Sequence, residues 1–412
     1  MNNNKYKVLL SQKKYIRLLL ADLVSRFGDS IDAIAYSWIM YEITKSESLM
    51  ALIIGLNYVP TVIFQPFLGV LVDRMRKKKI MVCMDIIRGF IVAGVIALYS
   101  MNALTPLFLC VFTLLTSTVE AIRMPAGSAF LPIILDKEYY TLGKAANYSL
   151  SRAVELIGLL LAGWLISVIS STGTLIIDML SFYISSALIC SINDKEVLKA
   201  TGKKLADIVS GFKEGVQFFN SHSIIKVLAL IGLLINFGIM PLSVFQTPYV
   251  SDYLKMGPEM LSVIKICMVI GMSVGAFIVP KITAIKRSAL TGIAGVIMGI
   301  TLIMMFVSPQ CENIILKIGI CIIAMFFIGF GGGILNVIIG GCMMESIPKD
   351  MMGRISGFIS SMMQFSMPIA SFICSALAVH ISVIQIFMIF GFITITVYMI
   401  LLMSKKLKVI ES

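Results

Sequence analysis

Residues 288–308 read SALTGIAGVIMGITLIMMFVS, an unbroken stretch without a charged side chain. A helix of that length is about 31 Å long, enough to cross the ~30 Å hydrocarbon layer of a bilayer. Comparable apolar runs recur along the chain from Ile16 to Met403. The sequence therefore predicts a protein that crosses a membrane many times.

The composition of the whole chain supports this prediction. Of its 412 residues, 58% are hydrophobic and 14% are charged, and the mean hydropathy is +0.96. Soluble domains are roughly 45–50% apolar and about 25% charged. A soluble enzyme is therefore excluded, and so is a disordered chain, which needs low hydrophobicity. The runs also lack the alternation of a transmembrane β-barrel.

We predict an all-α membrane protein with twelve transmembrane helices in two six-helix bundles. The longest polar stretch separates an N-terminal bundle, residues 1–193, from a C-terminal bundle, residues 224–412, with a cytoplasmic loop at 194–223. The expected spans are 16–42, 49–72, 80–100, 103–124, 144–168, 173–192, 224–250, 258–282, 288–308, 314–341, 355–380 and 383–403.

The distribution of Lys and Arg predicts an orientation. With the N-terminus inside, 27 of the 34 Lys and Arg residues fall on the inner side, four on the outer side and three within spans. Arg123, at the end of the fourth span, is counted on the inner side. Cytoplasmic loops of membrane proteins concentrate these residues, so we expect both termini in the cytoplasm. The same rule explains the net charge of +12, so we expect no nucleic acid as a partner.

The first span contains ADLVSRFGDSIDAIAYSWIMYE, residues 21–42, which is unusually rich in charge. Asp22, Arg26 and Asp29 are spaced to share one helix face and can pair. Asp29 lies near mid-membrane, and Asp32 follows one turn later. A charge at the bilayer centre costs about 2.5–3.5 kcal/mol, and one arginine cannot neutralise three aspartates. We expect a polar cavity here, in which Asp29 or Asp32 carries a proton or binds a cationic substrate; a static ion-pair network is the alternative.

Two further pairs have helical spacing. Arg152 and Glu155 form an i,i+3 pair in the fifth span, which could simply hold helices together. Alternatively, Glu155 and Arg26 of the first span could tune the aspartates. Asp85 and Arg88 have the same spacing near the inner end of the third span, and there we expect a structural pair.

Several classes of function lack their motifs. The chain contains no Walker A motif, no HExxH and no CxxC among its eight cysteines, and it has only two histidines. We therefore expect no metal, no cofactor and no enzymatic activity. A channel, a receptor-like scaffold or a gradient-driven transporter remains.

The loop after the second span resembles a family signature. Residues Gly69-Val-Leu-Val-Asp73-Arg74-Met-Arg76-Lys77-Lys78-Lys79 are similar to the loop between helices two and three of the major facilitator superfamily. Other segments resemble its macrolide-efflux and siderophore-exporter branch, a group of drug:proton antiporters. They are Pro125-Ala126 with Leu131-Pro132, Ala146-Asn147, Asp178 through Ala187, and Pro348 through Arg354.

This resemblance implies alternating access by two rocking bundles. The loop would latch the outward-open state, with Asp73 capping the eleventh helix near Arg354 and Lys77 meeting an acid on the fourth helix. Glu120 is the candidate for that acid. Gly69, Arg74 and Lys78 complete the predicted switch loop.

The expected function is proton-driven export of a small amphipathic organic compound across the cytoplasmic membrane by a monomer. The proton gradient would be the energy source. Gly158 and Gly163 of the fifth span keep two glycines typical of antiporters, but Leu159 stands where proline is usual. Uptake of a small nutrient by the same fold, or a non-transporting receptor or scaffold, therefore stays open.

Overall fold

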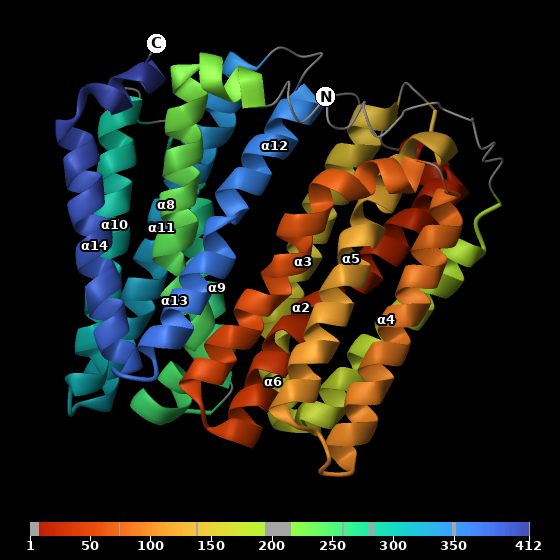
Figure 1. The fold of residues 1–412 in the computed structure, drawn as a ribbon, viewed down its shortest axis with the longest axis horizontal. Coiled ribbons are helices and arrows are strands. Elements are labelled where there is room, and N and C mark those ends of the chain that lie inside the picture. Colours follow the sequence, from red (N-terminus) through yellow and green to blue (C-terminus); the bar gives the residue numbers. More distant parts are fainter. Residues whose placement is uncertain are drawn as a thin grey trace. The chain divides into compact units, whose positions relative to one another are not determined.

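The computed structural model describes residues 8–73, 75–136, 139–193, 216–257, 259–279, 282, 285–347 and 352–411. These residues are almost entirely helical, and none of them lies in a strand (Figure 1). The chain divides into two compact units. The first unit is Met1–Thr44 with Leu56–Ile208, and the second unit is Lys45–Gly55 with Val209–Ser412.

The helices of each unit follow the apolar runs of the sequence. The first unit contains α2 (Lys13–Thr44), most of α3 (Glu47–Asp73), α4 (Lys77–Ser100), α5 (Pro106–Ile134) and α6 (Tyr140–Cys190). The second unit contains α8 (Ser223–Pro248), α9 (Glu259–Ile278), α10 (Arg287–Val307), α11 (Ile314–Ser346), α12 (Met352–Gln364), α13 (Ser366–Leu377) and α14 (Val383–Met403). Most of the predicted central loop, residues 194–215, lies outside the described residues, so its boundaries stay a prediction.

The number of membrane spans agrees with the sequence once two helices are considered individually. Ten helical segments are long and apolar enough to cross a membrane. Helix α2 is not among them because it is too rich in charge. Any 18 consecutive residues of α2 include at least three charged side chains. The segment Ala153–Cys190 counts as one although its 38 residues contain parts of two predicted spans. Adding α2 and the second half of α6 gives the predicted twelve.

The two halves of α6 meet at Ser170. There φ is 67° and ψ is 169°, a conformation that interrupts a helix. The Ser170 hydroxyl accepts a hydrogen bond from the Gly173 amide at 3.4 Å, which caps the second half in the way serine caps helix N-termini. The predicted spans 144–168 and 173–192 are therefore joined without a polar loop.

Two other helices differ from the prediction. Helix α5 continues ten residues past the expected end at 124, with Pro125 and Pro132 inside it. The predicted span 355–380 is broken into α12 and α13. Pro368 has no amide hydrogen to bond the carbonyl of Gln364, four residues earlier, so the helix cannot continue smoothly through that point.

Local sequence sets several helix starts. Thr105 precedes Pro106 of α5 and accepts a hydrogen bond from the Phe108 amide at 3.3 Å. Asn313 accepts one from the Ile315 amide at 2.9 Å at the start of α11. Such caps satisfy amides that have no partner within the helix.

Glycines allow α9 and α11 of the second unit to approach closely. Gly271 and Gly275 of α9 face backbone carbonyls of α11, and Gly329 and Gly333 of α11 face carbonyls of α9. A Cβ added at Gly333 would lie 2.1 Å from the carbonyl oxygen of Met272. Small residues at four-residue spacing are the usual means by which membrane helices pack backbone to backbone.

Candidate functional site

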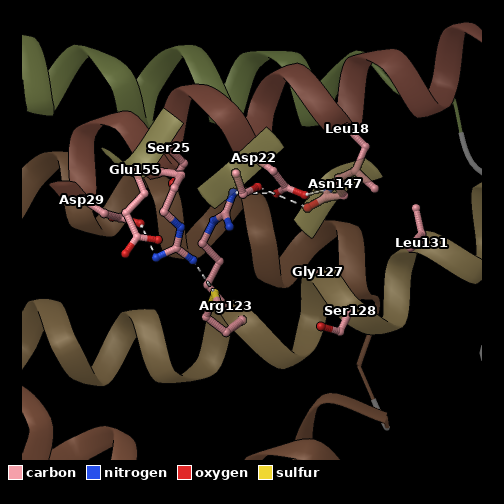
Figure 2. Close-up of a pocket in the computed structure, with 13 residues that line it drawn as sticks. Leu18, Asp22, Ser25, Asp29, Arg123, Gly127, Ser128, Leu131, Asn147 and Glu155 are labelled. Carbon is pink, nitrogen blue, oxygen red and sulfur yellow. Dashed lines mark hydrogen bonds and ion pairs between the residues drawn. The ribbon is translucent and has the colours of Figure 1, made fainter. Parts of the chain in front are cut away.

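The first unit contains a partly open cavity of about 210 Å³ between α2, α5 and α6, lined by apolar and charged side chains. That volume holds several water molecules. Figure 2 shows Asp29 and Glu155 toward one end of the cavity and Leu18 and Leu131 toward the other. The charged and amide side chains that line it are Asp22, Arg26, Asp29, Arg123, Asn147 and Glu155.

Asp29 of α2 binds α4 directly, and its two arginine partners reach α5 and α6. Its Oδ1 accepts a short hydrogen bond from Arg88 Nη2 of α4, and its Oδ2 lies 3.6 Å from Arg26 Nη1 on its own helix. Arg26 also lies 3.8 Å from Glu120 of α5. The Arg88 guanidinium carbon lies 4.0 Å from the centre of the Phe182 ring of α6, a cation–π contact.

Arg123 organises a second cluster. Its Nε donates a short hydrogen bond to Asp85 Oδ1, and its Nη2 lies 3.3 Å from Asp22 Oδ1. Ser185 donates to the other oxygen of Asp85 at 2.7 Å, and Asn147 donates to Asp22 at 2.8 Å. The Arg123 and Asp85 side chains are 7% and 0% exposed. This cluster joins α2, α4, α5 and α6.

Two pairings and one surface position expected from the sequence are wrong. Asp22 pairs with Arg123 of α5 instead of Arg26 on its own helix. Asp85 and Arg88 do not bond each other, since each takes a partner from another helix. Arg123 is an interior residue and not a base of the inner surface. In each case the residue bonds a side chain of another helix, whereas the sequence had suggested a partner on the same helix or a position at the surface.

Glu120 also has a different neighbour from the one expected. It lies near the middle of α5, beside Arg26, whereas Lys77 is the first residue of α4. Lys78 donates a hydrogen bond to the Ile192 carbonyl at 2.6 Å, just past the end of α6. The structure thus associates Glu120 with the charge network and not with the switch loop.

Several predicted residues fall outside the described side chains. They are Arg152, Gly69, Asp73, Arg74 and Arg354. The proposed latch between Asp73 and Arg354 and the pair of Arg152 with Glu155 therefore stay predictions. Glu155 itself lines the cavity.

Two buried aspartates have no ion-pair partner among the described residues. Asp32 of α2 is 7% exposed, and its Oδ1 makes no hydrogen bond there. Asp178 of α6 is 0% exposed, and neither of its oxygens makes one. Sequence reasoning did not select Asp178 as a site residue, although a carboxylate inside the apolar run TLIIDMLSFYISS is the signal that could have found it.

Among the side chains that the structure describes, the network carries more acids than bases. Its three arginines are Arg26, Arg88 and Arg123, and its six carboxyl groups are Asp22, Asp29, Asp32, Asp85, Glu120 and Asp178. Ionised carboxylates in excess of the arginines would be expensive inside a membrane. Some of these groups must therefore be neutralised. Among the residues that the structure describes, no group of His, Cys, Asp and Glu is arranged to hold a metal ion.

A multi-pass helical membrane protein with a polar, charged cavity inside one helical unit has the construction of a transporter. A sequence profile of the Major Facilitator Superfamily matches residues 18–371. The chain belongs to the Major Facilitator Superfamily. This confirms the expected family and the expected all-α fold.

The relatives include efflux proteins. The chain is 23% identical to macrolide efflux protein A of Streptococcus pyogenes over 400 residues, which cover 97% of each chain. It is 22% identical to the multidrug efflux pump Tap of Mycobacterium bovis over 297 residues, 68% of this chain and 70% of Tap. The crystal structure of the nucleoside transporter NupG has the same fold, with a TM-score of 0.72 at 12% identity over 94% of this chain and 98% of NupG.

Proposed function

We propose that this protein is a secondary active transporter that exports a small amphipathic organic compound in exchange for protons. Its relation to macrolide and multidrug efflux proteins supports the direction and the substrate class. The observation that carries the proton coupling is Asp29. Its carboxylate lines the cavity and at the same time holds Arg88 of α4.

Protonation of Asp29 would change how the helices are joined. The neutral acid loses most of its attraction for Arg88 and Arg26, because charge-assisted hydrogen bonds are roughly twice as strong as neutral ones. Arg26 then keeps Glu120 as its remaining partner. Binding a proton at Asp29 would thus loosen the tie between α2 and α4, which is the local step that alternating access needs.

The wider organisation is part of the same proposal. The excess of Lys and Arg on one side of the predicted spans supports a cytoplasmic-membrane protein with both termini inside. The loop around Asp73 would act as the conformational latch by its resemblance to the family signature. We propose a monomer that uses the proton gradient and no cofactor.

Proton release in inverted membrane vesicles tests the proposal. A pH-sensitive dye reports whether macrolides, cationic dyes or siderophores dissipate a preformed gradient. We expect release with at least one compound class, reduced at least tenfold by Asp29→Asn or Asp32→Asn. Glu345→Gln is the control, because Glu345 is an exposed carboxylate near the end of α11.

Two results would count against it. Full proton release in both Asn variants would remove Asp29 and Asp32 from the coupling. No release with any compound, while the purified protein keeps its helical circular dichroism spectrum, would reject proton-coupled efflux of these compounds. Uptake by the same fold would then become the leading hypothesis.

A further inference from the structure

Asp178 is a fully buried acid that the proposed function leaves unused. It lies on the second half of α6, it is 0% exposed, and neither of its oxygens has a hydrogen-bond donor among the described residues. A buried carboxylate without donors is unstable as an anion. Its charge therefore has to be removed by a bound cation.

The position of Asp178 places it against α2. A Cβ added at Gly28 of α2 would lie 2.6 Å from Asp178 Oδ1 and 2.0 Å from Ser181 Oγ. Gly28 and Asp32 are four residues apart and share one face of α2. Asp178 thus approaches the face of α2 that bears Asp32, which also has an unpartnered oxygen.

Arg88 contacts both an acid that lines the cavity and the helix that bears Asp178. One nitrogen, Nη2, bonds Asp29, but Nε and Nη1 have no partner among the described residues. Its guanidinium lies on the ring of Phe182, which is one helical turn after Asp178 on the same face of α6. Arg88 therefore has two nitrogens to spare, and Asp32 and Asp178 each have at least one oxygen without a partner among the described residues.

We infer that Asp32 and Asp178 form a second proton-binding site, sealed from the cavity, and that Arg88 exchanges between Asp29 and this site. In the present conformation Arg88 neutralises Asp29, and protons neutralise Asp32 and Asp178. When Arg88 leaves Asp29 and turns toward the sealed pair, one carboxyl group of the pair gives up its proton, and that proton passes to Asp29. The arginine and the proton thereby exchange places, so each carboxylate keeps a neutralising partner, and Asp29 holds its proton where it can exchange with the cavity.

The surroundings of the pair support a site for protons. Neither Asp32 nor Asp178 lines the cavity, so a water-filled path for a hydrated ion is absent from the described lining. The charged and titratable groups within electrostatic range of the pair are Asp29 and Tyr36 of α2, Arg88 of α4 and Glu120 of α5. Only one of these, Arg88, is a base, and it is already bound to Asp29.

The exchange step rests on the proposed function, whereas the protonated state of the pair does not. Infrared spectroscopy of the purified protein in lipid nanodiscs measures that state directly at neutral pH. Protonated carboxyl groups have a carbonyl stretching band that carboxylates lack. We expect Asp178→Asn to remove the band intensity of one carboxyl group and Asp178→Glu to keep the intensity at a shifted frequency.

Asp85→Asn is the matched control. Asp85 is equally buried but bonds Arg123 and Ser185, so its replacement should leave the protonated band unchanged. An unchanged band in both Asp178→Asn and Asp32→Asn would overturn the inference. Spectra recorded with choline and with sodium at the same ionic strength test whether sodium binds the pair instead of protons. A protonated band that decreases in sodium would overturn the assignment to protons.

The outcomes separate the two proposals. If the Asp178 band is present but no compound releases protons from vesicles, the sealed site stands and the transport proposal fails. If vesicles release protons on addition of a compound but the band is absent, the transport proposal stands and the sealed site is rejected. If both hold, Asp178→Asn should also reduce proton release at least tenfold.

Discussion

The buried pair of Arg123 and Asp85 provides the sharpest test of the interior charge network. Replacing Arg123 by Leu removes the partner of Asp85, which is 0% exposed, and one partner of Asp22. Leaving an uncompensated buried charge costs about 3–5 kcal/mol. That corresponds to a decrease of roughly 150- to 5,000-fold in the equilibrium between folded and unfolded protein.

The second substitution should act in the opposite direction. In the double variant Asp85→Asn with Arg123→Leu, the orphaned carboxylate is gone and the amide oxygen can still accept from Ser185. We therefore expect the double variant to be more stable than Arg123→Leu alone. Unfolding is measured by the loss of helical circular dichroism as sodium dodecyl sulfate is added to mixed micelles.

An exposed pair on the same chain is the control. Arg287 and Glu345 form a two-bond pair at 2.6 and 3.0 Å, but their side chains are 47% and 59% exposed. Exposed pairs contribute about 0–1 kcal/mol, so Arg287→Leu should hardly change the unfolding midpoint. Equal effects of Arg123→Leu and Arg287→Leu, or additive effects of Arg123→Leu and Asp85→Asn, would refute the buried network.

Two further predictions concern the second unit. Gly333→Ala should destabilise it by about 1–3 kcal/mol through overpacking, because the new Cβ would lie 2.1 Å from a carbonyl oxygen of α9. Gly332→Ala is the control and should be tolerated, because its Cβ would meet nothing within 4 Å. The stability of both variants is measured by thiol labelling of the buried Cys321 during heating. The hydrogen bond from Arg287 lowers the pKa of Glu345 below its ordinary 4.5. The small stabilisation by this pair should therefore be complete above about pH 5, and it should be lost as the pH falls through the lowered pKa. A difference in melting temperature between wild type and Glu345→Gln that grows toward low pH would contradict this.

The helices were predictable because each is fixed by its own residues. A run of about twenty apolar side chains must be helical in a bilayer, since its backbone groups have no other partners there. The sequence therefore located the spans to within a few residues. It failed where helix ends depend on neighbours, as at α5, and where a single residue such as Ser170 replaces a loop.

The site was predictable only in part, for a related reason. Spacing along one helix identifies residues that share a face, and it correctly drew attention to Asp29 and Arg26, which lie 3.6 Å apart. It does not say which helix supplies the facing residue. Three members of the network lie on helices other than α2 and were not expected in it. They are Arg88, Arg123 and Asp178.

The roles of the acids follow from these partners and not from their positions in sequence. Asp85 bonds an arginine and a serine from two other helices, so it joins the helices of the bundle. Asp29 is both paired and open to the cavity, so gaining a proton has a structural consequence there. Asp178 is closed and unpaired, so it is neutral until a positive group arrives. A carboxylate can couple proton binding to helix movement only if its partner is able to leave. Arg88 is the arginine in the network best placed to leave, because two of its nitrogens make no hydrogen bond among the described residues.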